Sequence, residues 1–445
     1  MSFSPHSTGE GGLRSESLFE KLWRSHLVDS VADGADLIAI DLHLLHDLGG
    51  PAALRAIQER DLRVHAPHQT FATADHGVST EPGRTDTSSE ATLWTLPALR
   101  RLCDALDVRL FDLNAAEQGI AHVIGPELGL TLPGLSVVCG DSQTCTHGAL
   151  GALAWGIGST EVMQVLAVQM LILERPKSMR ISIEGQLREG VTAKDVILHI
   201  IGCHGASGGV GYAVEFAGST VLSLSMEERM SLCNLSVEFG ARFGLVAPDE
   251  TTFTYLKGRP YAPGRAVWEV ALESWRTLRS DADTVFDLEL FIDATQIKPQ
   301  VTWGVTLDHV VAFDGAVPFL GPQASAGEAV ARQAVLDYMG LQPGALIAGT
   351  PIQHAFIGSC ANSRLSDLQA AAAIVEGRRV AAGVRAVVVP GSQGVKRAAE
   401  ALGLDKIFRD AGFQWREPGC SMCVAMNGAI KPSATYRVGM GNFPH

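Results

Sequence analysis

The last third of the chain alternates short apolar runs with helical patterns, and this alternation restricts the fold more than any other feature of the sequence. The apolar runs are HAFIGS at 354–359 and RAVVVPGS at 385–392, and helical patterns follow them at 363–377 and 395–412. Strands that alternate with helices predict a parallel sheet with helices packed on its faces. We therefore expect an α/β fold.

The whole chain is too long to fold around one hydrophobic core. It has 445 residues, and chains longer than about 250–300 residues usually divide into domains. The pattern changes at Pro176, where a strand of alternating polar and apolar residues begins, and again near 295–304. The expected parts are a flexible tail at 1–16 and α/β domains at 17–176, 177–302 and 303–445.

Shorter segments also show a regular spacing of apolar residues. Between residues 135 and 173 the pattern runs from a strand through a loop to a helix, and α/β proteins place ligand chemistry in such loops. Helical periodicity and apolar runs predict further elements elsewhere. The helices are expected at 17–28, 161–173, 191–202 and 226–244, and buried strands at 37–45 and 108–113.

The sequence is acidic and contains no basic cluster. Its formal net charge is -13, which makes it a poor candidate for binding nucleic acid or an anionic membrane. An acidic chain also repels acidic substrates, so a site that binds one has to be locally positive. The polar first residues contain no signal core, and no apolar run is long enough to span a bilayer. We expect a cytoplasmic protein without nucleic-acid or membrane partners.

Three of the eight cysteines occur in a pattern that suits metal chemistry. Cys360 follows a predicted strand, and Cys420 and Cys423 form a C-x-x-C pair. Structural zinc would need a fourth nitrogen or sulfur ligand, which no nearby residue supplies. A cubane iron–sulfur cluster uses one thiolate per iron, so three thiolates would leave one iron open as a Lewis acid. Spacing alone leaves open a metal or cluster, a redox dithiol and buried structural cysteines.

Acid and imidazole groups gather in loops near the predicted strand ends. Asp75 and His76 are adjacent in a Ser/Thr/Gly-rich loop, and a carboxylate beside an imidazole can tune it as a proton donor. Taken singly, such residues are more often satisfied loop residues or helix caps. Taken together, they are candidates for an active site. The candidates are Asp75, His76, His122, Asp141, Ser142 and Glu215.

Longer motifs surround these residues and cover nearly the whole chain from about residue 17. They are LFEKLWRSHLV, TFATADHGVST, HVIGPELGLTLPGLSVVCGDSQT, HGALGALAWGIGSTEV, LVAPDETTF, PQVTWG, FIGSCANSR, VVVPGS and PGCSMCVAMN. In this order they resemble the aconitase family, and within it the isopropylmalate dehydratase branch.

The resemblance implies three α/β domains around one [4Fe-4S] cluster held by Cys360, Cys420 and Cys423. It implies a hydro-lyase that isomerises 2- and 3-isopropylmalate, as in leucine biosynthesis, or a related substituted malate, by loss and return of water. It also implies that the six candidates occupy active-site positions. In the two-subunit branch the family's swivelling domain, which carries a base serine, is a separate protein, so the resemblance implies a small-subunit partner.

Three positions depart from the family pattern. Gln143 stands where the family has a histidine that would pair with Glu215, and glutamine cannot carry a titrating proton. Ala361 replaces a threonine, and Gly441 stands where the family has the first of two carboxylate-binding arginines, the second falling beyond His445. Three hypotheses stay open: the leucine-pathway isomerase, a hydro-lyase for another substituted malate, and an impaired cluster-binding subunit acting as a scaffold or iron sensor.

Overall fold

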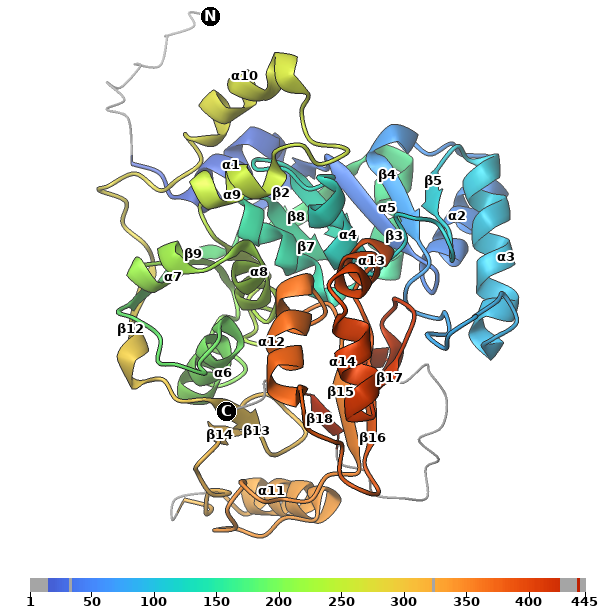
Figure 1. The fold of residues 1–445 in the computed structure, drawn as a ribbon. Coiled ribbons are helices and arrows are strands. Elements are labelled where there is room, and N and C mark those ends of the chain that lie inside the picture. Colours follow the sequence, from blue (N-terminus) through green and yellow to red (C-terminus); the bar gives the residue numbers. More distant parts are fainter. Residues whose placement is uncertain (1–14, 32–33, 322–324, 425–437, 441–445) are drawn as a thin grey trace, which may run out of the picture.

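The structure is a computed structural model, which describes residues 15–31, 34–321, 325–424 and 438–440. Three parallel sheets follow one another along the chain, each with helices packed against it (Figure 1). The expected α/β fold is therefore confirmed. The three sheets fall within the three expected domain ranges, but the division into domains stays a prediction. None of the described helices is both long and apolar enough to cross a membrane.

The first unit contains a sheet of five parallel strands in the order β5-β4-β3-β6-β7. Its strands are β3 (Leu42–His46), β4 (Thr70–Thr73), β5 (Arg109–Phe111), β6 (Ser136–Cys139) and β7 (Leu153–Gly156). Its helices are α1 (Leu18–His26), α2 (Gly50–Glu59), α3 (Glu90–Ala105), α4 (Ala121–Leu128) and α5 (Ser159–Val168). A separate antiparallel sheet contains β1 (Leu27–Val31), β2 (Ala35–Ala39) and β8 (Met170–Glu174). This strand order puts the loops after β4 and β6 on the two sides of β3.

The second unit contains a parallel sheet in the order β11-β10-β9-β12. Its strands are β9 (Lys177–Glu184), β10 (Tyr212–Ala217), β11 (Phe243–Leu245) and β12 (Leu288–Asp293). Its helices are α6 (Ala193–His204), α7 (Ser219–Ser223), α8 (Met226–Asn234), α9 (Glu250–Leu256) and α10 (Arg265–Trp275).

The third unit contains a parallel sheet in the order β17-β16-β15-β18. Its strands are β15 (His354–Ile357), β16 (Arg385–Val388), β17 (Gln414–Trp415) and β18 (Val438–Met440). Its helices are α12 (Leu365–Val375), α13 (Gln393–Ala401) and α14 (Leu404–Ala411). The hairpin of β13 (Gln300–Thr302) and β14 (Val310–Ala312) and the helix α11 (Ala326–Met339) precede this sheet.

Four predicted elements differ in the structure, and the fourth is the helix predicted over 226–244, which ends at Asn234. The apolar run 37–45 divides into β2 and β3, which belong to different sheets. The helix expected at 161–173 stops at Gln169, whose φ of 55° is left-handed, and the chain continues as β8. The helix expected at 395–412 divides into α13 and α14 at Gly403, whose φ is 76°. Periodicity detects such elements but not the backbone turn that divides them.

Hydrogen-bonded caps determine where several helices begin. The Ser17 hydroxyl accepts a hydrogen bond from the backbone N–H of Glu20, and the Glu20 carboxylate accepts one from the N–H of Ser17. This reciprocal pair satisfies two free N–H groups, so α1 begins directly after Ser17. The helix α8 begins in the same way after Ser225 and ends at Asn234, so it is shorter than the helix predicted over 226–244.

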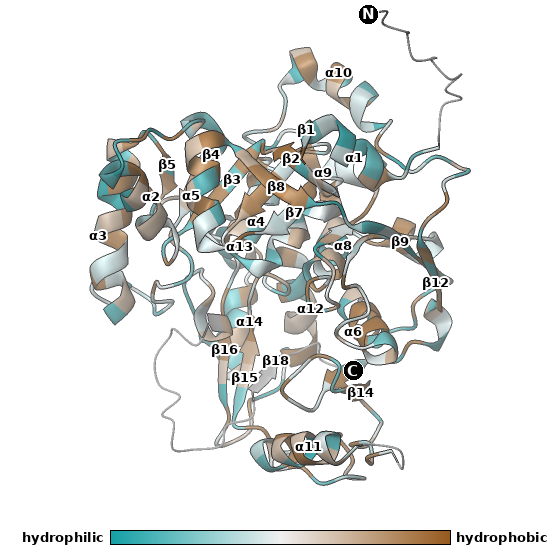
Figure 2. Cartoon of the chain, turned by 180° about the vertical axis from the view of Figure 1, so that it is seen from behind, coloured by the Kyte–Doolittle hydropathy of each residue, from teal (hydrophilic) through white to brown (hydrophobic). Residues whose placement is uncertain are grey.

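Aromatic side chains join the first two units through one shared core. Phe243 of β11 is fully buried, and its ring lies 5.7 Å from Phe19, 6.4 Å from Trp23 and 5.4 Å from Trp155, measured between centroids. Figure 2 shows hydrophobic colour on the nearby strands β2 and β8 and hydrophilic colour on the outer side of α1. Burial of these rings is expected to dominate the energy of this contact.

We predict that Phe243→Ala lowers the free energy of unfolding by about 3–5 kcal/mol, because it removes a buried ring and leaves a cavity between two units. Urea unfolding measures the change. Phe291→Ala is the matched control, since Phe291 is 73% exposed, and it should change stability by less than about 0.5 kcal/mol. Equal effects of the two substitutions would contradict the prediction.

Candidate active site

A cavity of about 960 Å³ lies where the three units meet. The first and third units supply its predicted site residues, and the second unit adds Asn234 and Glu238. The loops after β4, β6 and β15 all reach it, as expected for the carboxyl ends of parallel strands. Six of the nine predicted site residues line the cavity. They are His76, Asp141, Ser142, Cys360, Cys420 and Cys423.

His76 lies between two carboxylates at the cavity wall. Its Nδ1 is 2.7 Å from Asp75 Oδ1, and its Nε2 is 3.1 Å from Asp141 Oδ2. Burial acts to lower the pKa of His76, but the charge of Asp75 outweighs it and raises this pKa well above its ordinary value. The ring is therefore a protonated imidazolium, which is the form that can donate a proton into the cavity.

A second histidine approaches Asp141 from the protein interior. His122 Nε2 is 3.2 Å from Asp141 Oδ2, and its Nδ1 is 3.0 Å from His147 Nε2. His147 Nδ1 is 2.7 Å from Thr131 Oγ1. Burial, and then the charge of His122, lower the pKa of His147 well below its ordinary value, so His147 is neutral. This chain orients His122 toward Asp141. His147 is not among the site residues predicted from the sequence.

Asp141 therefore contacts two imidazole rings. Its side chain is 14% exposed, whereas those of His76 and His122 are 9% and 0% exposed. Burial acts to raise the pKa of Asp141, but His122 and His76 outweigh it and hold this pKa well below its ordinary value. The carboxylate stays ionised and links the two predicted proton-transfer pairs.

A buried carboxylate at the end of β3 positions the loop that carries Asp75 and His76. Asp47 accepts backbone hydrogen bonds from Asp75 (3.0 Å), His76 (2.8 Å) and Gly77 (2.8 Å). The ring of His46 lies 4.3 Å from that of His76, and burial, followed by the charge of His76, lowers the pKa of His46. Neither residue was predicted from the sequence, although His46 ends β3, the strand next to β4, and Asp47 directly follows it.

The three predicted cluster cysteines converge on the same cavity. Cys360 and Cys420 are buried and Cys423 is exposed. Ser359 and Ser421, which adjoin Cys360 and Cys420, have left-handed φ angles of 73° and 53°. Such a conformation is costly for a residue with a side chain and concentrates at functional sites. Both cysteine loops are therefore held in uncommon turns.

Hydrogen-bond donors face two of these sulfur atoms. Asn234 Nδ2 donates to Cys360 Sγ at 3.2 Å, and the Ser359 hydroxyl donates to Cys423 Sγ at 3.4 Å. Burial raises the pKa of Cys360 to about 12, so as a free thiol it would stay protonated. Metal binding replaces such protons, and the donors suit the thiolates that would result.

This donor set fits an iron–sulfur cluster. Three cysteines line the described part of the cavity, and no fourth one does. A second group that could hold a metal consists of Asp75, His76 and Cys420, whose ligand atoms lie within 4.8 Å of one another. Both ring nitrogens of His76 already face carboxylates. The three cysteines are therefore the better ligand set.

Two buried arginines hold the cysteine loops against the first unit. Arg364 donates to the backbone oxygens of Cys360 (2.8 Å) and His122 (3.2 Å). Arg84 donates to the backbone oxygens of Pro418 (2.5 Å) and Leu113 (2.8 Å). These contacts fix the distance between the histidine loops and the cysteine loops.

The structure does not bring Glu215 to the cavity. Its carboxylate accepts a hydrogen bond from Ser280 Oγ at 2.7 Å, and burial raises its pKa. The partner of Gln143 is instead Glu238, whose Oε1 accepts a hydrogen bond from Gln143 Nε2 at 3.0 Å. Glu238 and Asn234 lie four residues apart in NLSVE, and polar residues that alternate with apolar ones were the signal that could have identified them.

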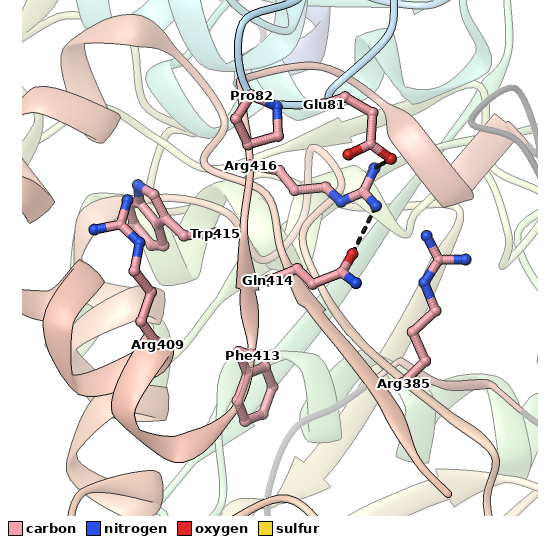
Figure 3. Close-up of a pocket in the computed structure, with 8 residues that line it drawn as sticks. All are labelled: Glu81, Pro82, Arg385, Arg409, Phe413, Gln414, Trp415 and Arg416. Carbon is pink, nitrogen blue, oxygen red and sulfur yellow. Dashed lines mark hydrogen bonds and ion pairs between the residues drawn. The ribbon is translucent and has the colours of Figure 1, made fainter.

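Other predictions fall outside the described residues or the cavity. Gly441 and the residues after it are not described, nor are residues 1–14 of the expected tail. A smaller hollow of about 380 Å³ separates the Glu81 loop from β17 (Figure 3). There Arg416 pairs with Glu81 at 2.7 Å and donates to Gln414 at 2.7 Å. None of the predicted site residues lines this hollow. Its residues belong to a contact between the first and third units.

Comparison with known proteins places this chain in a family. The model of the Aconitase family (aconitate hydratase) matches residues 20–442, and the chain belongs to that family. The 3-isopropylmalate dehydratase large subunit 1 of Bradyrhizobium diazoefficiens is 56% identical over 429 residues, which cover 96% of this chain and 90% of that protein. The crystal structure of Thermococcus kodakaraensis aconitase X in its holo-form matches 86% of this chain and 79% of that chain, with 14% identity and a TM-score of 0.45. That likeness is too distant to carry a functional comparison.

We predict that Asp141→Asn destabilises the cluster-free chain by about 1.5–3 kcal/mol at pH 7, since hydrogen bonds to a charged group are lost. The folded pKa of Asp141 is depressed, so its contribution is present above the unfolded value near 4 and is lost as the pH falls through the folded value. The difference in the free energy of unfolding between the wild type and Asp141→Asn should therefore become smaller as the pH falls. Urea midpoints from pH 7 to 3 measure it, with exposed Asp410→Asn as the control. A gap that stays constant would refute the assignment.

Proposed function

We propose that the chain is the large subunit of an iron–sulfur hydro-lyase that isomerises 2- and 3-isopropylmalate or a closely related 2-substituted malate. The observation that carries this proposal is the placement of the imidazolium of His76 in the same cavity as Cys360, Cys420 and Cys423. The 56% identity to a 3-isopropylmalate dehydratase large subunit supports the substrate class. The scaffold or iron-sensor hypothesis has no comparable support, because the proton-transfer groups are present.

Cys360, Cys420 and Cys423 would hold a [4Fe-4S] cluster, which supplies a Lewis-acidic iron when bound. His76 delivers a proton from Nε2 to the leaving hydroxyl, and Asp75 holds the opposite ring nitrogen. His122 and Asp141 supply the second proton-transfer pair. Arg364 and the units that meet around the cavity keep these groups in register. Reversal of the same proton transfers returns water to the neighbouring carbon.

We further propose a small-subunit partner that completes the site. The name of the relative, "large subunit", supports this partner. In the resembling family the small subunit carries the serine that removes the proton from carbon, and its closure over the cavity would exclude water. The proposed complex therefore divides the acid and the base of the reaction between two chains.

We predict that Cys360→Ser, Cys420→Ser and Cys423→Ser each abolish cluster assembly, because each removes one of three thiolate ligands. Anaerobic reconstitution followed by iron and sulfide analysis and visible absorbance measures the loss. Cys103→Ser and Cys203→Ser are the controls and should retain a wild-type cluster that air bleaches. Stoichiometric zinc without iron or sulfide in the wild-type protein would contradict the proposed cofactor.

We predict that the reconstituted chain alone turns over 3-isopropylmalate at least about 10²-fold more slowly than its complex with the small subunit, because general base catalysis typically contributes about 10²- to 10⁴-fold. An anaerobic assay on a panel of 2-substituted malates tests both the activity and the substituent. Full turnover by the isolated chain would place the base within it. No turnover of any malate by the loaded complex would overturn the proposed function.

A further inference from the structure

The cavity presents an electrostatic problem for any substrate that carries two carboxylates. Asp141 and Glu238 line it together with three cysteines, and the chain as a whole has a formal net charge of -13. A malate-type dianion therefore needs at least one fixed cation inside the site. Among the described residues that line the cavity, Lys194 is the only lysine or arginine.

The nearby arginines are committed to the protein backbone. The Nη1 and Nη2 groups of Arg364 donate to the oxygens of Cys360 and His122. Those of Arg84 donate to Pro418 and Leu113. Both arginines are buried, and neither lines the cavity. They stabilise the loops and are not placed to receive a ligand carboxylate.

Lys194 lacks the ion pair that a lysine in such a place normally has. Its Nζ donates to Asn362 Oδ1 at 3.0 Å, and Asn362 is neutral. The adjacent Asp195 accepts backbone hydrogen bonds from Thr192 (2.8 Å) and Gln300 (2.7 Å). No ion pair of Lys194 with a carboxylate is found in the described part of the chain, although the charges of Asp367 and Asp195 act to raise the pKa of Lys194.

The position of Lys194 also costs stability. It lies in the first turn of α6, where the positive end of the helix dipole disfavours a cation. Burial lowers its pKa, which reports a second cost of holding charge there. An unpaired cation kept in an unfavourable place and facing a cavity indicates a ligand that supplies the missing negative charge.

We infer that Lys194 binds one carboxylate of the substrate, with Asn362 orienting its ammonium group. This inference rests on the proposed function for the substrate class, a 2-substituted malate dianion. It makes Lys194 a substrate-binding residue of this chain, independent of any cation that the partner brings. Asn362 adjoins the Cys360 loop, so the carboxylate would lie beside the cluster.

A binding cycle tests the inference with 2-isopropylsuccinate, which lacks the hydroxyl group and cannot be dehydrated. Anaerobic titration calorimetry on the loaded two-subunit complex compares this diacid with its two monoamides, each of which replaces one carboxylate with a neutral amide. In the wild type, one monoamide should bind at least about 30-fold more weakly than the diacid, the lower range for losing one partner of a buried charge pair. In Lys194→Met, the same monoamide and the diacid should bind within about threefold of each other.

Two further variants separate binding from structure. Lys194→Arg should retain most of the wild-type preference, and Lys406→Met, which changes an exposed lysine of α14, should retain all of it. Iron and sulfide content of Lys194→Met should match the wild type, and its melting temperature should be no lower than that of the wild type. Loss of the cluster in Lys194→Met would overturn the inference, since Lys194 would then balance the charge of the cluster. An unchanged preference in Lys194→Met would also overturn it.

The outcomes for the proposed function are distinct, because the cycle requires no turnover. A complex that shows the Lys194-dependent preference but dehydrates none of the malates would leave the inference standing and remove the proposed function. An active complex whose preference for the diacid is independent of Lys194 would support the proposed function and overturn the inference about Lys194. A complex that neither binds the diacid nor dehydrates any malate would overturn both.

Discussion

The contact between the loops of the first and third units is the constraint on which the rest of the site depends. The proposed proton-transfer groups belong to the first unit and the cysteines to the third, so the proposed chemistry requires both sets. Arg364 and Arg84 hold the two sets together by donating hydrogen bonds to backbone oxygens on both sides. Guanidinium groups suit this task because they present several fixed donors and stay charged when buried.

At the cavity, burial and neighbouring charge determine the pKa of each ionisable group and therefore its role in the proposed chemistry. The charge of Asp75 raises the pKa of His76, whereas burial and neighbouring charge lower the pKa values of His46 and His147. The raised pKa of His76 suits its proposed role as the proton donor. Lys194 adds the second fixed cation. The proposed chemistry and the proposed substrate binding thus follow from the same balance between burial and paired charge.

Part of the site could be predicted from the sequence because its residues occur in short local motifs. Cys360 follows a predicted strand, Cys420 and Cys423 form a C-x-x-C pair, and Asp75 adjoins His76. The motif order of the family implied that they share one site. Asp47 and Glu238 could not be predicted in this way. Each acts on a partner 28 to 95 residues distant, and no local spacing reports such a contact.

The sequence by itself determined the α/β class, the aconitase family and six of the residues that line the cavity, because periodicity and motif order are properties of short segments. Only the tertiary structure decided that Glu215 turns to Ser280 and that Glu238 takes the place beside Gln143. It also decided that Lys194 faces the cavity without a carboxylate partner. The sequence fixes which side chains are ionisable. The pKa and the partner of each one depend on the groups that long-range packing places around it.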